Sequence, residues 1–292
     1  MSNKFVLNAD DFGMSEAYNE AIKEGYSFGV LKSTSLTANG EAFDGAVEKV
    51  LPECPELGVG VHLNIIEGKS LNKELNTLTD SEGNFNNSYI QMLIKAYKDK
   101  EFLEQVEKEF RSQIEKVRDK GINITHLDSH VHTHSIPPIF KIVCKLANEY
   151  GIKQVRTQCE RFYIIPDLFI HLSIKYFVNL IKVVLLKYFT IQNKITVRQN
   201  NLKTNDYLIG VAYTSMMSGL TVACGLDVLK NKRNIVAEAL IHPCRYEDGT
   251  IDNHFMEFLI TKNKKLMDKI GRLNFEISNY KQSEEENEGA DK

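Results

Sequence analysis

Short apolar segments alternate with amphipathic helical patterns along most of this 292-residue chain, and few tight-turn signals separate neighbouring apolar segments. Strands that alternate with helices usually pair in parallel, because each helix returns the chain to the edge where the next strand begins. The pattern therefore predicts an α/β fold in which helices cover a parallel sheet. The expected strands are 4–9, 33–38, 57–64, 122–127, 153–157, 206–211, 235–241 and 274–278.

The expected helices carry apolar residues at intervals of three or four. This number of strands in fewer than 280 residues, without a Pro- or Ser-rich linker, favours one closed or nearly closed barrel over two domains. We place that barrel at 1–280 and expect a disordered acidic tail at 281–292. The expected helices are 15–28, 41–51, 89–97, 101–120, 138–150, 255–270 and a long apolar one within 162–189.

The segment 162–189 is apolar enough to raise the question of membrane insertion. It also contains Pro166, and Lys175, Lys182 and Lys187 recur on one face of the expected helix. Charges at this density would be costly in a bilayer core. An amphipathic helix that covers the core or contacts a second copy of the chain is the better interpretation. We therefore expect no membrane partner and allow a homodimer.

The composition is that of a soluble globular protein, with 42% hydrophobic and 26% charged residues and a net charge of −3. This charge gives no reason to expect nucleic acid as a partner. The five cysteines form no Cys-x-x-Cys pair, and no signal-peptide pattern is present at the start of the chain. We therefore expect free thiols and a reducing, cytoplasmic location.

Half of the eight histidines lie within nine residues, directly after an apolar stretch. They are His126, His130, His132 and His134, and Asp128 lies among them. Because histidine is the commonest metal ligand, the cluster indicates a metal centre, although not all four rings can bind one ion. We expect His134 at the solvated surface.

Polar residues follow two other expected strands as well. Asp10 and Asp11 follow the first strand, and His62 stands near the end of the third. Each alone is commonly a turn cap or a structural side chain. The carboxyl ends of parallel strands, however, meet at one edge of the sheet, which would bring these residues to the histidine cluster. Such nitrogen and oxygen ligands suit Zn²⁺, Mn²⁺, Co²⁺ or Ni²⁺, and Mg²⁺ less comfortably.

Other residues have the chemistry to assist a bound cation. One carboxylate of the Asp10–Asp11 pair is free to act as general base, and His242, at the end of another expected strand, could protonate a leaving group. The chain has no Gly-x-Ser-x-Gly elbow, no Walker loop and no Gly-x-Gly-x-x-Gly turn. The motifs typical of serine hydrolases, P-loop enzymes and dinucleotide-binding enzymes are therefore missing.

At these residues the chain resembles the YdjC-like carbohydrate deacetylases, the group that includes the chitooligosaccharide deacetylases. The matching segments are 8–13 (NADDFG), 60–64 (GVHLN), 125–132 (THLDSHVH), 155–156 (VR) and 241–243 (IHP). The resemblance implies an irregular TIM-like (β/α) barrel that hydrolyses the N-acetyl group of an amino sugar. It also implies a divalent metal, usually described as Mg²⁺, although the ligands leave Zn²⁺ or another transition metal open.

Carried over position by position, the resemblance implies a role for each candidate residue. The metal ligands would be Asp11, His62 and His126, the catalytic residues Asp10 and His242, and the substrate-binding residues His130, His132 and Arg156. Two other functions stay open. A phosphoesterase-like metallohydrolase is weakened because few cationic residues flank the ligands, Arg156 excepted. The other alternative is a sugar- or metal-binding protein without catalytic activity.

Overall fold

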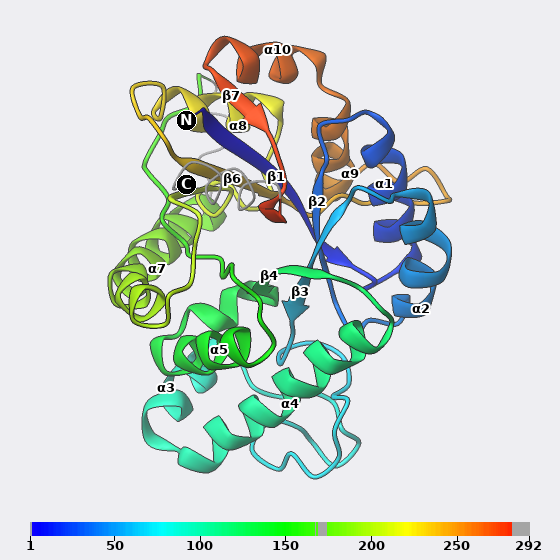
Figure 1. Ribbon diagram of the computed structural model, residues 1–292, viewed down its shortest axis with the longest axis vertical. Coiled ribbons are helices and arrows are strands. Elements are labelled where there is room, and N and C mark those ends of the chain that lie inside the picture. The colour runs from blue at the N-terminus through cyan, green and yellow to red at the C-terminus, as the bar shows by residue number, and fades with distance from the viewer. Residues whose placement is uncertain (1, 167, 169–173, 282–292) are drawn as a thin grey trace.

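Six parallel strands form one curled sheet in the order β4-β3-β2-β1-β6-β5, and β7 pairs with the start of β1 (Figure 1). The structure is a computed structural model that describes residues 2–166, 168 and 174–281. All partners of β1 are parallel to it, as the alternation of strands and helices predicts. The strands are β1 Asn3–Phe12, β2 Ser33–Leu36, β3 Gly58–Leu63, β4 Ile124–Ser129, β5 Tyr207–Ile209, β6 Val236–Ile241 and β7 Phe275–Ile277.

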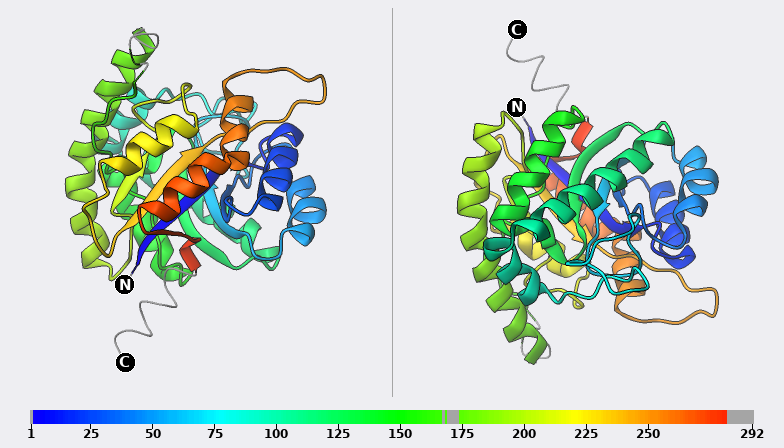
Figure 2. Two further views of the ribbon diagram at one scale, coloured as in Figure 1. Left: turned by 90° about the horizontal axis from the view of Figure 1, so that it is seen from above. Right: turned by 90° about the horizontal axis from the view of Figure 1, so that it is seen from below.

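Helices surround this sheet, with α7 on the opposite side from α1 and α2 (Figures 1 and 2). Because both faces of the sheet are covered, all ten residues of β1 are buried, including Asp10 and Asp11. The helices are α1 Glu16–Ser27, α2 Phe43–Gly45, α3 Tyr89–Lys98, α4 Lys100–Asp119, α5 Pro137–Glu149, α7 Ile174–Gln199, α8 Gly219–Asp227, α9 Asn253–Phe258 and α10 Lys264–Arg272. Shorter turns are η1 Ala46–Val50, η2 Leu51–Glu53, η3 His130–Ser135 and η4 Leu259–Lys262.

Within the described part of the chain, pairing beyond β4 and β5 consists of single parallel bridges. Leu127 of β4 bridges Val155, and Gln154 bridges Lys203. The expected strand 153–157 is therefore present only as isolated bridges. The structure thus shows an α/β domain with a curled parallel sheet surrounded by helices.

Several expected boundaries were wrong. The expected helix 255–270 is divided, because the side chain of Asn263 accepts a hydrogen bond from the Leu266 amide and starts a new helix there. Helix α8 was not anticipated. The long apolar helix expected within 162–189 is offset: 162–165 are not helical, and α7 runs from 174 to 199. Residues 282–292, most of the expected acidic tail, lie outside the described residues.

Among the residues that the structure describes, no helix is both long and apolar enough to cross a membrane.

Candidate metal centre

The two aspartates of β1 reach the same centre because the strand is irregular at its end. Neighbouring side chains of a regular strand point to opposite faces. Asp11, however, has a left-handed backbone with a φ of 65°, and the register between β1 and β2 shifts between Ala9 and Phe12. Such a bulge redirects a side chain, and bulges of this kind are common beside functional sites. As a result, Asp10 and Asp11 each place an oxygen within 4.8 Å of a nitrogen of His62.

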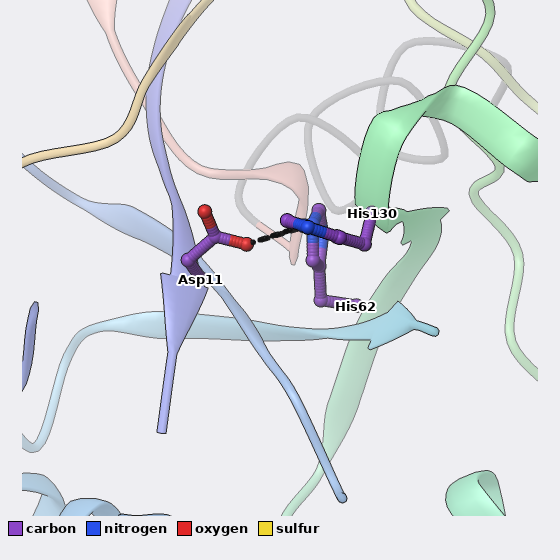
Figure 3. Close-up of side chains that lie close together, drawn as sticks. All are labelled: Asp11, His62 and His130. Carbon is purple, nitrogen blue, oxygen red and sulfur yellow. Dashed lines mark hydrogen bonds and ion pairs between the residues drawn. The ribbon is translucent and has the colours of Figure 1, made fainter. Parts of the chain in front are cut away.

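Asp11, His62 and His130 offer ligand atoms around one point (Figure 3). One atom of each lies within 4.8 Å of the others. Asp11 Oδ1 is 3.3 Å from His62 Nε2 and 2.8 Å from His130 Nδ1. The three residues come from β1, β3 and the η3 turn that follows β4. The expected meeting of strand ends therefore occurs, and His130 belongs to the group.

Each histidine of this group has a second carboxylate on its other ring nitrogen. Asp128 Oδ1 lies 2.8 Å from His62 Nδ1, and Glu67 Oε2 lies 3.0 Å from His130 Nε2. Histidines that bind metals usually donate their remaining N–H to a carboxylate, which fixes the tautomer and the ring orientation. The two outer carboxylates thus direct His62 Nε2 and His130 Nδ1 toward the shared point.

The charges around this point suit a cation. Burial alone would raise the pKa of Asp11, but the charges and hydrogen bonds of His130 and His62 hold it well below its ordinary value. Burial would lower the pKa values of the two histidines, yet the neighbouring carboxylates raise them to about 10 for His62 and about 9 for His130. Positive charge is therefore favoured here, and a metal ion would replace these protons.

The donor set fits a divalent metal ion. One carboxylate oxygen and two imidazole nitrogens would leave coordination positions for water and substrate, as catalytic sites require. Two nitrogen donors suit Zn²⁺ and neighbouring transition metals, whereas Mg²⁺ prefers oxygen. Asp11, His62 and His130 are thus the residues that could hold the ion.

Arg156 joins the acidic residues behind this group into a buried cluster. Its Nη1 and Nη2 each lie 2.7 Å from an oxygen of Asp10, and Nη2 lies 2.8 Å from Asp128 Oδ2. Nε donates to Glu238 at 2.8 Å, and Glu238 also accepts a hydrogen bond from Tyr280. Arg156 has no exposed surface. The substrate-binding role expected for it therefore has no support in the structure, because its guanidinium is occupied by three carboxylates.

His126, which the resemblance implied as a metal ligand, is not brought into the group. Its Nε2 lies 3.1 Å from Ser35 Oγ and its Nδ1 2.9 Å from Thr125 Oγ1. The ring packs 4.6 Å from that of Tyr280. Burial lowers the pKa of His126 to about 4, so the ring is neutral, and both of its hydrogen-bond partners are hydroxyl groups.

The strand register explains this placement. His62 of β3 pairs with Asp128 of β4, so His126, two residues earlier in β4, lies deeper in the sheet, beside Gly60. A Cβ atom on Gly60 would come within 2.4 Å of the His126 ring. The glycine therefore provides the room for a histidine inside the sheet, below the metal group.

His132 lies within a left-handed turn and His134 follows it; Val131 and His132 have φ values of 51° and 57°. His132 Nδ1 is buried and has no hydrogen-bond partner among the described residues. His134 is fully buried, with Nδ1 2.5 Å from Ser129 Oγ and Nε2 3.1 Å from the Arg156 carbonyl oxygen. The expectation that His134 lies at the surface was therefore wrong.

His242 follows β6 and pairs with a buried glutamate. Its Nδ1 lies 3.2 Å from Glu257 Oε2, and Glu257 is 2% exposed. Burial would lower the pKa of His242, but the hydrogen bond and charge of Glu257, with Asp11 and Asp10 nearby, raise it to about 9. His242 is therefore a protonated imidazole at neutral pH, close to the acidic centre.

Three acidic residues of the site were not singled out in the sequence. Glu67 lies in the loop after β3, Glu238 in β6 and Glu257 in α9. The alternation of β6 could have placed Glu238 inward, since it lies two residues from Leu240 in a buried strand. Glu67 and Glu257 carry no such signal, because their positions depend on loop and helix placement.

Comparison with curated proteins finds relatives that match about half of this chain. A carbohydrate deacetylase from Clostridium beijerinckii is 42% identical over 149 residues, which cover 51% of this chain and 58% of the relative. One from Listeria monocytogenes serotype 4b is 45% identical over 150 residues, 51% of this chain and 59% of the relative. The chain thus spans less than two thirds of the length of these curated relatives.

A solved structure shares the fold. It is described as a putative cellobiose-phosphate cleavage protein from Enterococcus faecalis, and it superposes with a TM-score of 0.74 over 97% of this chain and 99% of that one. Its identity is 22%, so the likeness concerns the fold alone. The profile of the family described as YdjC-like protein matches residues 4–278. Because this match covers nearly the whole chain, the protein belongs to the YdjC-like family.

Proposed function

We propose that this chain is a metal-dependent deacetylase that hydrolyses the N-acetyl group of an amino sugar or a chitooligosaccharide. The observation that carries the proposal is the Asp11–His62–His130 group, with outer carboxylates on both histidines and Asp10 beside it. The deacetylase names of the relatives support the reaction class. The chitooligosaccharide is the finer part of the proposal.

Asp11, His62 and His130 would hold the cation. When bound, a divalent cation acts as a Lewis acid that lowers the pKa of water and polarises an acyl oxygen. Asp128 and Glu67 would keep the two imidazoles oriented. We propose Zn²⁺ or another transition metal as readily as Mg²⁺, since two of the three donors are nitrogen.

Asp10 is the proposed base. Burial would raise the pKa of Asp10, yet the charge of Arg156 keeps it below its ordinary value, so the group is ionised at neutral pH. Both its oxygens bind Arg156, which fixes the orientation of this carboxylate beside His62. We therefore assign Arg156 to positioning Asp10 rather than to contact with the sugar.

His242 is the proposed acid. With a pKa of about 9 it carries a proton at neutral pH, and it can pass that proton to the departing sugar amine. Glu257 would then stabilise and orient the ring. His132, with an unpaired buried nitrogen beside the ligands, is proposed to hydrogen-bond the substrate.

We also infer that the curled sheet is an irregular TIM-like barrel. The bridges Leu127–Val155 and Gln154–Lys203, together with the bond from the Asp206 amide to the Val236 carbonyl, support a path from β4 round to β6. The structure adds no support for phosphoesterase activity. Arg156 was the residue that favoured a phosphate substrate, but its guanidinium is paired with three carboxylates.

Acetate release tests the function. Metal-loaded protein is incubated with N-acetylglucosamine, its dimer and longer chitooligosaccharides, with and without chelator. We expect acetate only with metal, and strong loss of turnover with retained metal in Asp10→Asn. A metal-loaded wild type that binds these sugars but releases no acetate would contradict the proposal and favour a binding protein.

A further inference from the structure

Helix α7 carries a continuous row of apolar side chains on the face that points to solvent. Its members recur at alternating intervals of three and four residues, and each is more than half exposed. This is the spacing of a helix that packs along a second helix, because it keeps one stripe on the same side over many turns. The apolar seam consists of Ile174, Phe177, Ile181, Val184, Tyr188, Ile191 and Ile195.

The opposite face of α7 fixes the helix to the domain, so the seam cannot turn inward. That face is buried over the whole helix length, and α7 packs on α5 and η3. Asn193 Nδ2 donates to the Ser135 carbonyl oxygen at 2.7 Å, and Asn179 Nδ2 to that of Thr214 at 3.1 Å. Figure 2 shows α7 along the outer side of the molecule, where no other described element covers it.

The seam is large for a surface without a partner. Seven side chains of this size, each more than half exposed, present on the order of 700 Å² of apolar surface. The largest apolar patch of a typical monomer is about 300–600 Å², whereas a standard protein interface buries about 800 Å² on each partner.

The middle of the seam also has the shape of a helix–helix contact. A hollow at this point is lined by α7 side chains alone. Apart from Leu180, they are spaced i, i+3, i+4 and i+7, which is the arrangement of four residues that receives one side chain of a facing helix. The four are Ile181, Val184, Leu185 and Tyr188.

We propose that the apolar seam binds the same seam of a second copy of this chain, in an antiparallel pair centred on Val184. A two-fold axis makes one surface serve both partners. An antiparallel arrangement is favoured because it opposes the two helix dipoles. In this arrangement, a seam residue before Val184 in one copy faces a seam residue at a similar distance after Val184 in the other copy. Aliphatic and aromatic side chains therefore meet along the whole seam. The facing pairs are Ile174 with Ile195, Phe177 with Ile191, Ile181 with Tyr188, and Val184 with its own copy.

The charges of α7 give this contact a characteristic salt dependence. Residues 174–199 include five cations and no acidic residue. Two copies would therefore bring like charges near each other, and added salt would screen that repulsion and strengthen the dimer. An anionic lipid surface would show the opposite behaviour, since salt weakens its attraction for cations.

The first experiment measures the mass of the full-length chain in solution by light scattering during size-exclusion chromatography, at tens of micromolar protein. For the wild type we expect twice the mass of one chain and a dimer affinity that increases from low to high salt. For Ile181→Lys and Val184→Lys we expect the mass of a single chain. Both sites are exposed, so folding is retained and is checked by circular dichroism. Ile251→Lys, at an exposed isoleucine outside the seam, should remain dimeric.

The second experiment tests the direction of the pair. With diamide as the oxidant, Val184→Cys should form an intermolecular disulfide, whereas Ile174→Cys should form one only in a mixture with Ile195→Cys. Wild-type protein gives the background from the native cysteines. A monomeric wild type at these concentrations overturns the proposal, and so does a monomer that binds anionic vesicles at low salt. Disulfide formation by Ile174→Cys alone overturns the antiparallel arrangement.

Discussion

Glu67 Oε2 lies 3.0 Å from His130 Nε2, while Asp11 Oδ1 lies 2.8 Å from Nδ1 of the same ring. The imidazole of His130 thus lies between the buried carboxylate of Asp11 in the metal group and the exposed carboxylate of Glu67. Glu67 belongs to a loop and its side chain is 64% exposed, so it contributes little to packing. Its role would be to set the direction of the ring.

The first prediction concerns this outer carboxylate. We expect Glu67→Ala to weaken metal binding about 10- to 100-fold, the usual cost of losing such a partner. The thermal midpoint of the metal-free protein should stay unchanged, because the side chain is exposed. Mn²⁺ or Zn²⁺ titration by calorimetry measures the affinity. Glu82→Ala, at an exposed glutamate of the same loop, is the matched control, and equal affinities in both variants would remove Glu67 from the site.

The second prediction separates the two histidines that could complete the metal group. His130→Ala should lose bound metal, because it removes one of three ligand atoms. His126→Ala should keep stoichiometric metal and instead lower the free energy of unfolding, since it leaves a cavity under Tyr280. Elemental analysis of both purified variants decides between them. Loss of metal in His126→Ala with retention in His130→Ala would restore the ligand set implied by sequence resemblance.

The third prediction uses the pKa of His242. The proton on His242 is present below a pKa of about 9, so deacetylation should fall as the pH rises through 9. Glu257→Gln removes the partner that raises this pKa, and burial then lowers it. The alkaline limb of kcat should shift downward by roughly one to two pH units. Glu247→Gln, at an exposed glutamate, should leave the profile where it is. An unchanged limb in Glu257→Gln would mean that His242 is not the acid.

The fourth prediction concerns the buried charges behind the metal group. Arg156→Met removes the cation shared by Asp10, Asp128 and Glu238 and should cost about 3–5 kcal/mol of unfolding free energy, because buried carboxylates lose their partner. Arg245→Met, which breaks a surface pair with Glu24, should cost less than about 1 kcal/mol. Chemical denaturation measures both. Similar losses would show that the buried cluster contributes no more than a surface pair.

The fifth prediction tests the close approach of Gly60 and His126. Gly60→Ala should destabilise the fold by about 1–3 kcal/mol, because the new methyl group meets the imidazole ring. His126→Ala in the same chain should recover part of this loss, and a double-mutant cycle measures the recovery. Gly271→Ala, where the methyl group meets no neighbour, is the control. Strict additivity of the two changes would contradict the packing.

Hydrophobic periodicity predicted most of the strands and the parallel pairing, because the side chains of a strand covered on both faces must be apolar. It also placed Asp11 and His62 at one end of the sheet. It was partly right at 153–157, where the parallel pairing is present as single bridges, and it was wrong at Asn263, where a cap divides a helix. Apolar spacing alone does not report such local hydrogen bonds.

The sequence by itself determined the chemistry at the sheet edge: aspartates and histidines follow strands that must run in parallel. Only the tertiary structure decided that His130, rather than His126, stands beside Asp11 and His62. The physical reason is that alternation tells which face a side chain takes, whereas its depth along the sheet depends on strand register. Because His62 pairs with Asp128, His126 lies two residues deeper in the sheet than the metal group. His130 comes after the end of β4, and the left-handed turn that follows it leaves its ring at the edge of the sheet.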